Sequence, residues 1–356
     1  MLKGRWFSVV LLGICIFIYL FSLNSLRVEN YYSLKFFPVI AEFLRLIFGW
    51  IRFSVGDFLY LSIVLYLIFK VIKNIKSLKK SKPNKKKILL KLEKAFKFLA
   101  IIYIVFNVFW GINYNRVGVS SQLNLKIEPV SKAEIIKLNY ILIEKVNKSK
   151  LNASSVYPDN HLMFEQVNQA FQSASIKYPF LKYKYPSIKS SLWGWLGNYT
   201  GFTGYYNPFT GEAQINTLVP KFLHPYIACH EVAHQLGYAK EMEANFVGFL
   251  AAKSSDNPSF HYSVYLDLFT YANRSLYYVD TAQALALRDK LNDAVKTDIS
   301  VWREFNRRHK NPVEPIIRWT YGKFLQSNNQ PDGIYSYDQV ITFMVAYYKK
   351  YGTGRN

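Results

Sequence analysis

The first 116 residues alternate between long apolar runs and clusters of basic residues. No charged residue occurs from Trp6 to Leu26, and about 20 apolar residues are needed to cross the hydrocarbon core of a bilayer. A cleavable signal peptide is the competing interpretation, but this run is longer than a typical signal-peptide core and no small-residue cleavage site follows it. We therefore predict a first membrane span at about residues 6–25 that stays attached to the chain.

Two further apolar runs predict two more spans, at about residues 53–72 and 98–115. The segment 36–51 is also apolar, but it contains Glu42 and Arg45. Placing either charge at the centre of a membrane helix costs roughly 2.5–3.5 kcal/mol. We expect this segment to lie at the membrane interface rather than to span.

Residues 117–356 are predicted to form one mainly α-helical domain. The sequence SKAE from Ser131 is a capping box that begins a helix reaching about residue 148, and the next helix covers 161–174. Between them and the later helices, GYYNPFTGEAQIN predicts a β-hairpin with its turn at residues 208–211. A helix is predicted to begin near Pro220, and later helical stretches cover roughly 262–278, 281–308, 314–326 and 337–350.

The positive charge is concentrated beside the apolar runs. The chain has 45 Lys and Arg against 23 Asp and Glu, a net charge of +22. Eleven lysines and one acid lie between Lys73 and Lys97, so this segment alone carries +10. Because basic loops stay in the cytoplasm, residues 73–97 predict a cytoplasmic loop, a cytoplasmic N-terminus and an extracytoplasmic domain 117–356. The charge thus indicates a lipid bilayer, in a bacterium the inner membrane with a periplasmic domain, and no nucleic-acid partner.

The predicted helix after Pro220 contains the sequence HEVAH, an HExxH motif from His230 to His234. Residues four apart lie on one helical face, so both imidazoles can bind one Zn²⁺. Glu231 is rotated by about 100° from His230. We therefore expect its carboxylate beside the metal, where it can act as the catalytic base on a zinc-bound water.

A third metal ligand is predicted from the helix that follows. Gly237 can end the first helix in a left-handed conformation, and the new helix offers Glu241 and Glu243, which point about 200° apart. Glu241 shares its face with small or polar residues such as Gly248, which would allow close approach of the two helices. We assign Glu241 as the third ligand, keep Glu243 as the alternative, and predict that Asn245 hydrogen-bonds a ligand histidine.

Other residues carry weaker predictions. Tyr337 is our choice for stabilising the transition state, with Tyr335 and His261 as alternatives. The strand from Glu212 to Asn216 could be a sheet edge to which an extended peptide adds, although an ordinary hairpin is an equally good interpretation. Cys229 is interpreted as a buried core thiol, and His224, His161 and His309 are given no role in the metal site.

These motifs resemble known families. The run ExxAN after HExxH is similar to the third-ligand helix of gluzincin peptidases, although the spacing of six residues is short. Three N-terminal spans with GYYNPFTGEAQINTLVP, HEVAHQLGYAKEMEANF and QPDGIYSYDQV resemble the bacterial family catalogued as domain of unknown function 3810. The resemblance implies a membrane-anchored zinc peptidase with an α-rich, zincin-like domain.

The function that we expect is therefore hydrolysis of peptide bonds in an unidentified peptide or protein outside the cytoplasm. The alternative is a non-catalytic envelope scaffold or binding protein with a structural metal site. Structural zinc sites have four protein ligands and are usually rich in cysteine, whereas this site has three ligands and no well-placed cysteine. An intramembrane protease is disfavoured, because HExxH lies more than a hundred residues beyond the last predicted span.

Overall fold

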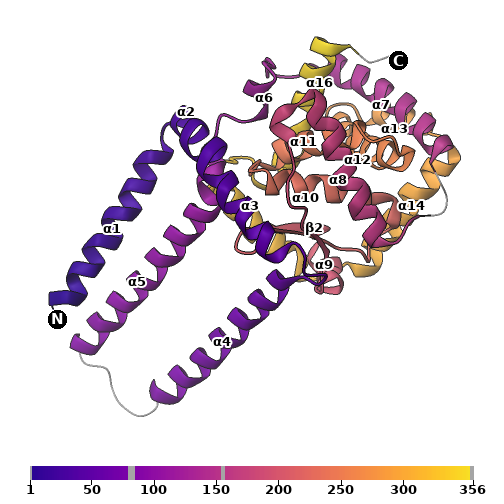
Figure 1. The fold of residues 1–356 in the computed structure, drawn as a ribbon. Helices are drawn as coiled ribbons and strands as arrows, with labels where there is room; N and C mark the ends of the chain where they lie inside the picture. Colours follow the sequence, from indigo (N-terminus) through magenta and orange to yellow (C-terminus); the bar gives the residue numbers. More distant parts are fainter. Residues whose placement is uncertain (1, 79–84, 154–156, 353–356) are drawn as a thin grey trace.

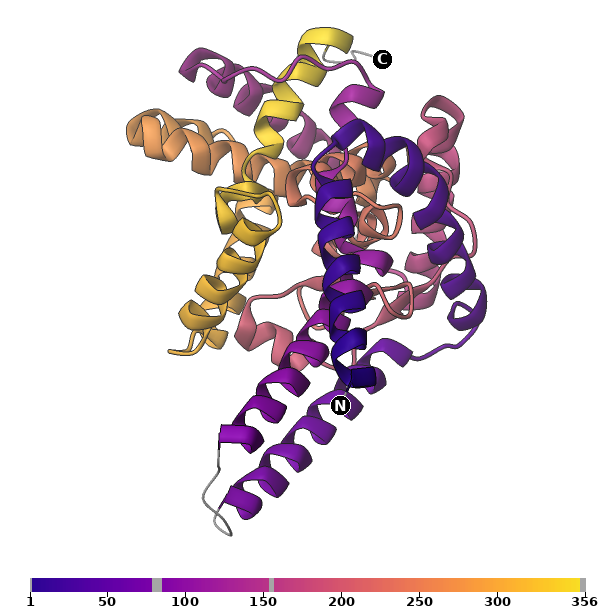
Figure 2. The ribbon, with the colours of Figure 1, turned by 90° about the vertical axis from the view of Figure 1, so that its left-hand side faces the viewer.

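The computed structural model describes residues 2–78, 85–153 and 157–352. The chain is mainly helical, as predicted, and has one small sheet. Three long N-terminal helices, α1 (Leu2–Ser22), α4 (Val55–Leu78) and α5 (Lys85–Phe109), project from one side of a globular helical part (Figure 1). Figure 2 shows from a second direction that all three extend toward the same end of the molecule.

One or two of the described helices have the length and composition of a membrane span, rather than the predicted three. α4 qualifies by itself over Val55–Lys73. α1 qualifies only together with the segment Ser25–Phe48, to which it is bent by 99°. α5 does not qualify, because its first half contains the lysines and only the part from Phe98 onward is apolar.

Much of the segment 73–97, predicted as a cytoplasmic loop, is helical in the described residues. α4 continues to Leu78 and α5 begins at Lys85, so both flanks of the segment 73–97 are helical. Residues 79–84 at its middle lie outside the described residues. The sequence pattern identified where the positive charge begins. The helices α4 and α5 nevertheless extend into the charged segment from its two ends, because lysine is a good helix former.

The segment between α1 and α4 folds against the globular part. It consists of α2 (Ser25–Arg27), the π-helical stretch η1 (Val28–Phe36) and α3 (Phe37–Phe48). The Arg45 side chain is buried and donates to the backbone oxygens of Lys184 and Gln235, at 3.0 and 3.2 Å. Glu42 pairs with Lys184 at 3.2 Å. Both charges that argued against a span therefore contact protein.

The globular part contains most of the predicted helices, with small changes in their ends. The capping box at Ser131 is present, and the long helix predicted for 281–308 is broken in two between residues 289 and 293. The helices and 3₁₀ turns are η2 (Gly111–Asn115), α6 (Val119–Gln122), α7 (Lys132–Asn152), α8 (Asn160–Lys177), η3 (Pro179–Leu181), α9 (Gly194–Thr200), η4 (Lys221–Leu223), α10 (His224–Gln235), α11 (Glu241–Lys253), α12 (Pro258–Val279), α13 (Thr281–Asp289), α14 (Asp293–His309), α15 (Glu314–Ser327), η5 (Gly333–Tyr337) and α16 (Val340–Tyr351).

The sheet has three strands in the order β1-β3-β2. The hairpin of β2 (Gly204–Asn207) and β3 (Glu212–Ile215) is antiparallel, as predicted, and β1 (Ile188–Ser190) pairs with β3 in parallel. The expectation that Glu212–Asn216 forms a sheet edge is therefore wrong: β3 is central, and β2 is an edge. Nothing in the sequence around 188–190 alternates strongly enough to predict β1.

The pairing pattern shows which backbone groups of β2 remain unused by the sheet. Asn216 N donates to Thr203 O at 2.9 Å, and paired residues in an antiparallel ladder alternate between bonded and non-bonded. Gly204 and Tyr206 are then the non-bonded positions. Their N–H and C=O groups point away from β3, toward the free side of β2.

Helices α10 and α11 lie at the centre of the globular part. α10 packs on β2 and β3 on one side and on α11 and α12 on the other, while α8, α12 and α16 cover α11. A Cβ at Gly248 would lie 3.1 Å from the backbone nitrogen of His230, so the predicted close approach of the two helices is present and depends on glycine. The metal motif is thereby held by the main hydrophobic core.

Candidate metal centre

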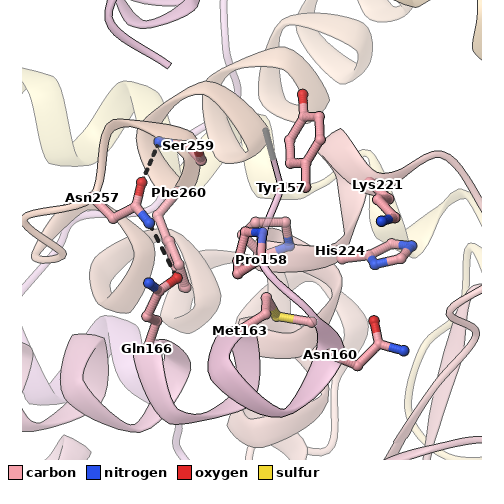
Figure 3. Close-up of a pocket in the computed structure, with 11 residues that line it drawn as sticks. Tyr157, Pro158, Asn160, Met163, Gln166, Lys221, His224, Asn257, Ser259 and Phe260 are labelled. Atoms are coloured by element: carbon pink, nitrogen blue, oxygen red, sulfur yellow. Dashed lines mark hydrogen bonds between the residues drawn. The ribbon is translucent and has the colours of Figure 1, made fainter. Parts of the chain in front are cut away.

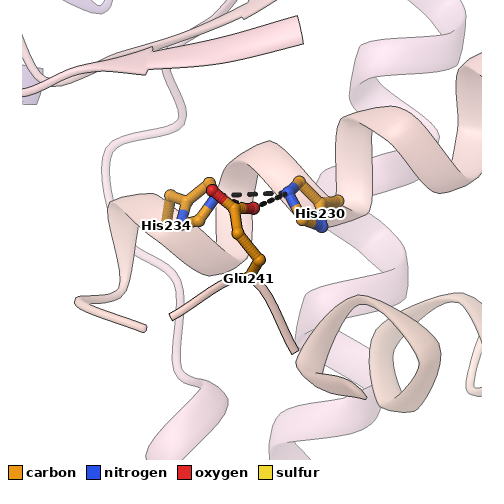
Figure 4. A group of neighbouring side chains, drawn as sticks. All are labelled: His230, His234 and Glu241. Atoms are coloured by element: carbon orange, nitrogen blue, oxygen red, sulfur yellow. Dashed lines mark hydrogen bonds and ion pairs between the residues drawn. The ribbon is translucent and has the colours of Figure 1, made fainter. Parts of the chain in front are cut away.

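Three side chains converge at the junction of α10 and α11 (Figure 4). The Nε2 atoms of His230 and His234 lie 3.1 Å apart. Glu241 Oε2 is 3.3 Å from the first and 3.5 Å from the second, and all three donor atoms lie within 4.8 Å of one another. Of the two candidate carboxylates, the structure brings Glu241 to the histidines and not Glu243.

The turn between the helices produces this convergence. Gly237 has φ +87°, a conformation that costs little only for glycine. Its N–H donates to His234 O at 2.8 Å, and Tyr238 N donates to Ala233 O at 3.2 Å. The chain therefore reverses directly after the second histidine, and the first residue of α11 faces the motif.

Neighbouring groups orient two of the three donors. His234 Nδ1 donates to the backbone oxygen of Tyr238 at 2.7 Å, which leaves the Nε2 lone pair free to bind a cation. The Tyr321 hydroxyl donates to Glu241 Oε1 at 2.7 Å. His230 Nδ1 is buried and has no hydrogen-bond partner among the described residues.

The electrostatics of Glu241 and His234 suit a cation. Burial acts to raise the pKa of Glu241, but His234 and His230 outweigh it and hold that pKa well below its usual value. Burial acts to lower the pKa of His234, but Glu241 raises it to about 9. Two imidazole nitrogens and one carboxylate are the donor set of catalytic zinc sites that keep a fourth position open. The residues present therefore fit a metal ion.

Glu231 lies beside the three donors, as its place in the motif predicted. Its side chain is buried, and its Oε2 has no hydrogen-bond partner among the described residues. Burial raises its pKa to about 7 against the opposing effect of the two histidines. A Cβ at Gly204 would lie 2.6 Å from Glu231 Oε1, so this carboxylate occupies the space that a side chain on β2 would need.

A cavity of about 520 Å³ opens next to His230 and Glu231. It is bounded by the start of β2, by α9 and by α12, α14 and α15. A second pocket, around His224 and Met163 (Figure 3), holds only about 10 Å³, room for roughly one water. Of these two pockets, only the first has space for a substrate, and His224 is not part of the metal centre, as predicted.

Of the other predicted residues, Tyr337 and Asn245 both line the cavity. The Tyr337 ring stacks on His230, with centroids 6.2 Å apart, and its hydroxyl is hydrogen-bonded to Tyr321. Asn245 does not bond a ligand histidine, so that prediction is wrong: it donates to Tyr337 O at 3.4 Å and accepts from the Tyr226 hydroxyl at 3.4 Å.

The remaining sequence candidates lie elsewhere. Tyr335 is exposed, and neither Tyr335 nor His261 lines the cavity. Cys229 is a free, fully buried thiol whose pKa is raised by burial, as expected for a core residue.

Sequence reasoning missed several polar residues of the cavity, above all Asp267. The backbone N of Tyr226 donates to Ser263 Oγ at 3.1 Å, so one turn further along each helix Asp267 is level with His230. Burial raises the pKa of Asp267 to about 6, although Arg274 and His230 act to lower it. Polar residues at 263, 267, 271 and 274 follow one face of α12, and this stripe could have identified them.

The N-terminal segment also contributes to the metal centre. The Trp110 and His234 rings meet in a T-shaped contact, with centroids 5.9 Å apart. Arg116 is buried, donates to Gly237 O at 3.1 Å, and pairs with Glu29 at 2.7 Å. Contacts of the centre thus cross the boundary that we predicted after residue 116.

Comparison with known proteins places the chain in a family. The family described as "Protein of unknown function (DUF3810)" matches residues 32–345. The chain belongs to this family. The matched region includes α4, α5, the sheet and the whole metal centre, so the resemblance inferred from the motifs is confirmed at the level of family. No curated protein and no solved structure matches the chain.

Proposed function

We propose that this chain is a membrane-anchored zinc metallopeptidase that hydrolyses peptide bonds on the extracytoplasmic side of the bacterial inner membrane. The observation that carries the proposal is a buried carboxylate, Glu231, whose Oε2 has no hydrogen-bond partner among the described residues. It lies beside three convergent metal donors at the wall of a cavity of about 520 Å³. A purely structural metal site needs neither a free carboxylate nor a cavity, which favours catalysis over a scaffold.

His230, His234 and Glu241 would hold the zinc ion. When bound, zinc would act as a Lewis acid toward a peptide carbonyl and lower the pKa of water. Glu231 would take a proton from the attacking water, whose oxygen bonds to the carbonyl carbon, and then pass the proton to the amine as the C–N bond breaks. Tyr337, stacked on His230 and facing the cavity, remains our choice for stabilising the oxyanion.

The free side of β2 supports an extended peptide as substrate. The unused N–H and C=O groups of Gly204 lie next to the Glu231 carboxylate, and Gly204 itself lines the cavity. A peptide pairing with β2 as an added strand would therefore pass its backbone beside the catalytic base. β2 therefore takes the place of β3 as the proposed peptide-binding strand, because β3 is already paired on both sides.

The anchoring follows from the N-terminal helices. We propose that α1, α4 and α5 cross the membrane, with the lysine segment 73–97 in the cytoplasm. The cavity and metal centre then lie outside, because they belong to the part from which these helices project.

The test uses the purified full chain, loaded with zinc in detergent, and a broad peptide library. The wild type should cleave library members, and Glu231→Gln should bind zinc normally but lose turnover by roughly 100-fold or more. Glu243→Gln is the matched control, a buried carboxylate on α11 away from the histidines. Full activity of Glu231→Gln would refute the mechanism, and zinc binding without cleavage in the wild type would favour the scaffold.

A further inference from the structure

Helix α9 presents an exposed apolar face next to the cavity. Leu192, Trp195, Leu196 and Tyr199 have exposed fractions of 46, 54, 43 and 46%. Trp195, Leu196 and Tyr199 share one side of α9, and Leu192 lies in the turn just before the helix. An exposed cluster of four large apolar side chains, two of them Trp and Tyr, is costly in water and indicates a contact surface.

Helix α15 presents a second such face. Val313, Ile316 and Trp319 follow one another at intervals of three residues and are 54, 63 and 66% exposed. α9 and α15 pack against each other, and Asn311, just before α15, donates to the backbone oxygen of Tyr199 at 2.6 Å. The two faces therefore belong to neighbouring elements.

Both elements are attached to the outer ends of the long N-terminal helices. Leu192 N donates to Asp57 Oδ2 at 2.7 Å, and Asp57 lies in the first turn of α4, where the apolar stretch begins. Phe324 of α15 meets Phe106 edge-on, at 6.1 Å between centroids, one turn before the end of α5. Figure 1 shows α9 beside this end of α4.

The chemistry of these faces matches a lipid surface. Trp and Tyr concentrate at membrane interfaces, because their rings are apolar and their edges carry a hydrogen-bonding group. Exposed cations, Lys310, Arg318 and Lys323, accompany the apolar side chains. Anionic headgroups attract such residues near the membrane surface. A soluble partner would explain the apolar side chains, but not their position at the ends of the long helices.

We propose that α9 and the first turns of α15 rest in the headgroup region of the membrane that α4 crosses. Asn198 and Thr200 of α9 and Glu314 and Arg318 of α15 line the cavity, so the cavity then opens at the lipid surface. Its substrates are consequently membrane-attached chains, cleaved close to their anchor, rather than freely diffusing peptides. The substrate class rests on the proposed peptidase function, whereas the lipid contact does not.

The lipid contact is tested with nitroxide spin labels on the full chain, in nanodiscs of phosphatidylethanolamine and phosphatidylglycerol. Single cysteines replace Trp195, Ile316 or Trp319 in a Cys15→Ser background, since Cys229 is fully buried. These labels should collide with dissolved oxygen and be shielded from a water-soluble nickel chelate, as should a label at Val64 within α4. A label at Tyr278, 72% exposed, should show the reverse.

Two outcomes would overturn the lipid contact. The nickel chelate would reach the labels at 195, 316 and 319 as readily as the label at 278 if this surface faced water. Shielding of the three labels from both reagents would instead show that protein, such as a second copy of the chain, covers it.

The substrate class is tested with one peptide library in two forms, free in solution and palmitoylated at the N-terminus in vesicles of the same lipids. The wild type should cleave the palmitoylated form at least tenfold faster. The double variant Trp195→Ser, Trp319→Ser should lose most of this advantage and keep its activity on the free library. Equal rates on both forms in the wild type would refute the substrate class, and cleavage of neither would refute the peptidase function while leaving the spin-label result standing.

Discussion

The choice of Glu241 as third metal ligand makes a sharp prediction, because α11 contains its own control. Glu241 and Glu243 are both buried carboxylates in the first turn of one helix. Only Glu241 lies within 3.5 Å of both histidine Nε2 atoms, whereas Glu243 packs against Gly118. Replacing each by glutamine changes the same charge at the same depth but removes a metal donor only at Glu241.

The expected magnitude follows from the number of donors. Structural zinc sites with four protein ligands bind with about 10–16 kcal/mol, or roughly 2.5–4 kcal/mol per ligand. Loss of Glu241 should therefore weaken zinc binding by about 10²–10³-fold. Tyr321→Phe removes only the hydroxyl that donates to Glu241 Oε1, for which a loss of about 10–100-fold is expected. Glu243→Gln should leave zinc affinity within about threefold of wild type.

Zinc affinity is measured by competition with a chromophoric chelator, with metal content after dialysis as a second readout. Thermal unfolding in the presence of EDTA separates loss of a ligand from loss of the fold. The assignment fails if Glu243→Gln weakens zinc binding as much as Glu241→Gln while both variants unfold at the wild-type temperature.

Three further predictions concern the groups around the centre. In metal-free protein, Asp267→Asn should raise the free energy of unfolding above pH 6 by at most about 3 kcal/mol. Burial raises the pKa of Asp267 in the folded state to about 6 from 3.8. The wild type therefore loses stability as the pH rises between these two values, and the variant does not. Gly204→Ala places a methyl group 2.6 Å from Glu231 Oε1 and should abolish peptide cleavage with zinc content unchanged. Arg116→Met leaves the buried Glu29 without its opposite charge and should destabilise the fold by about 3–5 kcal/mol, part of which Glu29→Gln should restore in the double variant.

Each of these has a distinct readout and a contrary result. Chemical unfolding at pH 4 and pH 8 checks the first, and an equal effect of Asp267→Asn at both would contradict the raised pKa. Cleavage assays with zinc analysis check the second, which fails if Gly204→Ala retains turnover. Unfolding temperatures of the two single variants and the double variant check the third, and simple additivity would show that Arg116 and Glu29 act independently.

Much of the site could be predicted from the sequence because it depends on helical periodicity. His230, His234 and Glu241 follow from spacing and from which face of α11 carries small residues, and both are local properties. The partners of these residues are not local. Asp267 reaches the site because α12 packs alongside α10. Strand β1 is only three residues long, yet its pairing makes β3 the central strand.

The same distinction explains why the partners of Arg45 and Asn245 were not predicted. The charge of Arg45 within an apolar run argued against a span, but its partners are the backbone oxygens of Lys184 and Gln235. Every residue has a backbone oxygen, so the sequence does not identify these partners. Asn245 was matched to a histidine by spacing alone, and the neighbouring Tyr226 and Tyr337 provide its bonds instead. Side-chain roles that depend on long-range backbone contacts are therefore the least predictable.

The contacts of Trp110, Arg116 and Arg45 with the end of the HExxH helix bear on how this protein could be regulated or produced. A protease that cut the chain between α5 and the globular part would strip the ring packed on His234 and the guanidinium groups bonded to Gln235 O and Gly237 O. The released fragment would carry all three metal donors but an unsupported turn between them. Cleavage at this point would therefore inactivate the site, and a soluble form for biochemistry has to retain residues well upstream of 117.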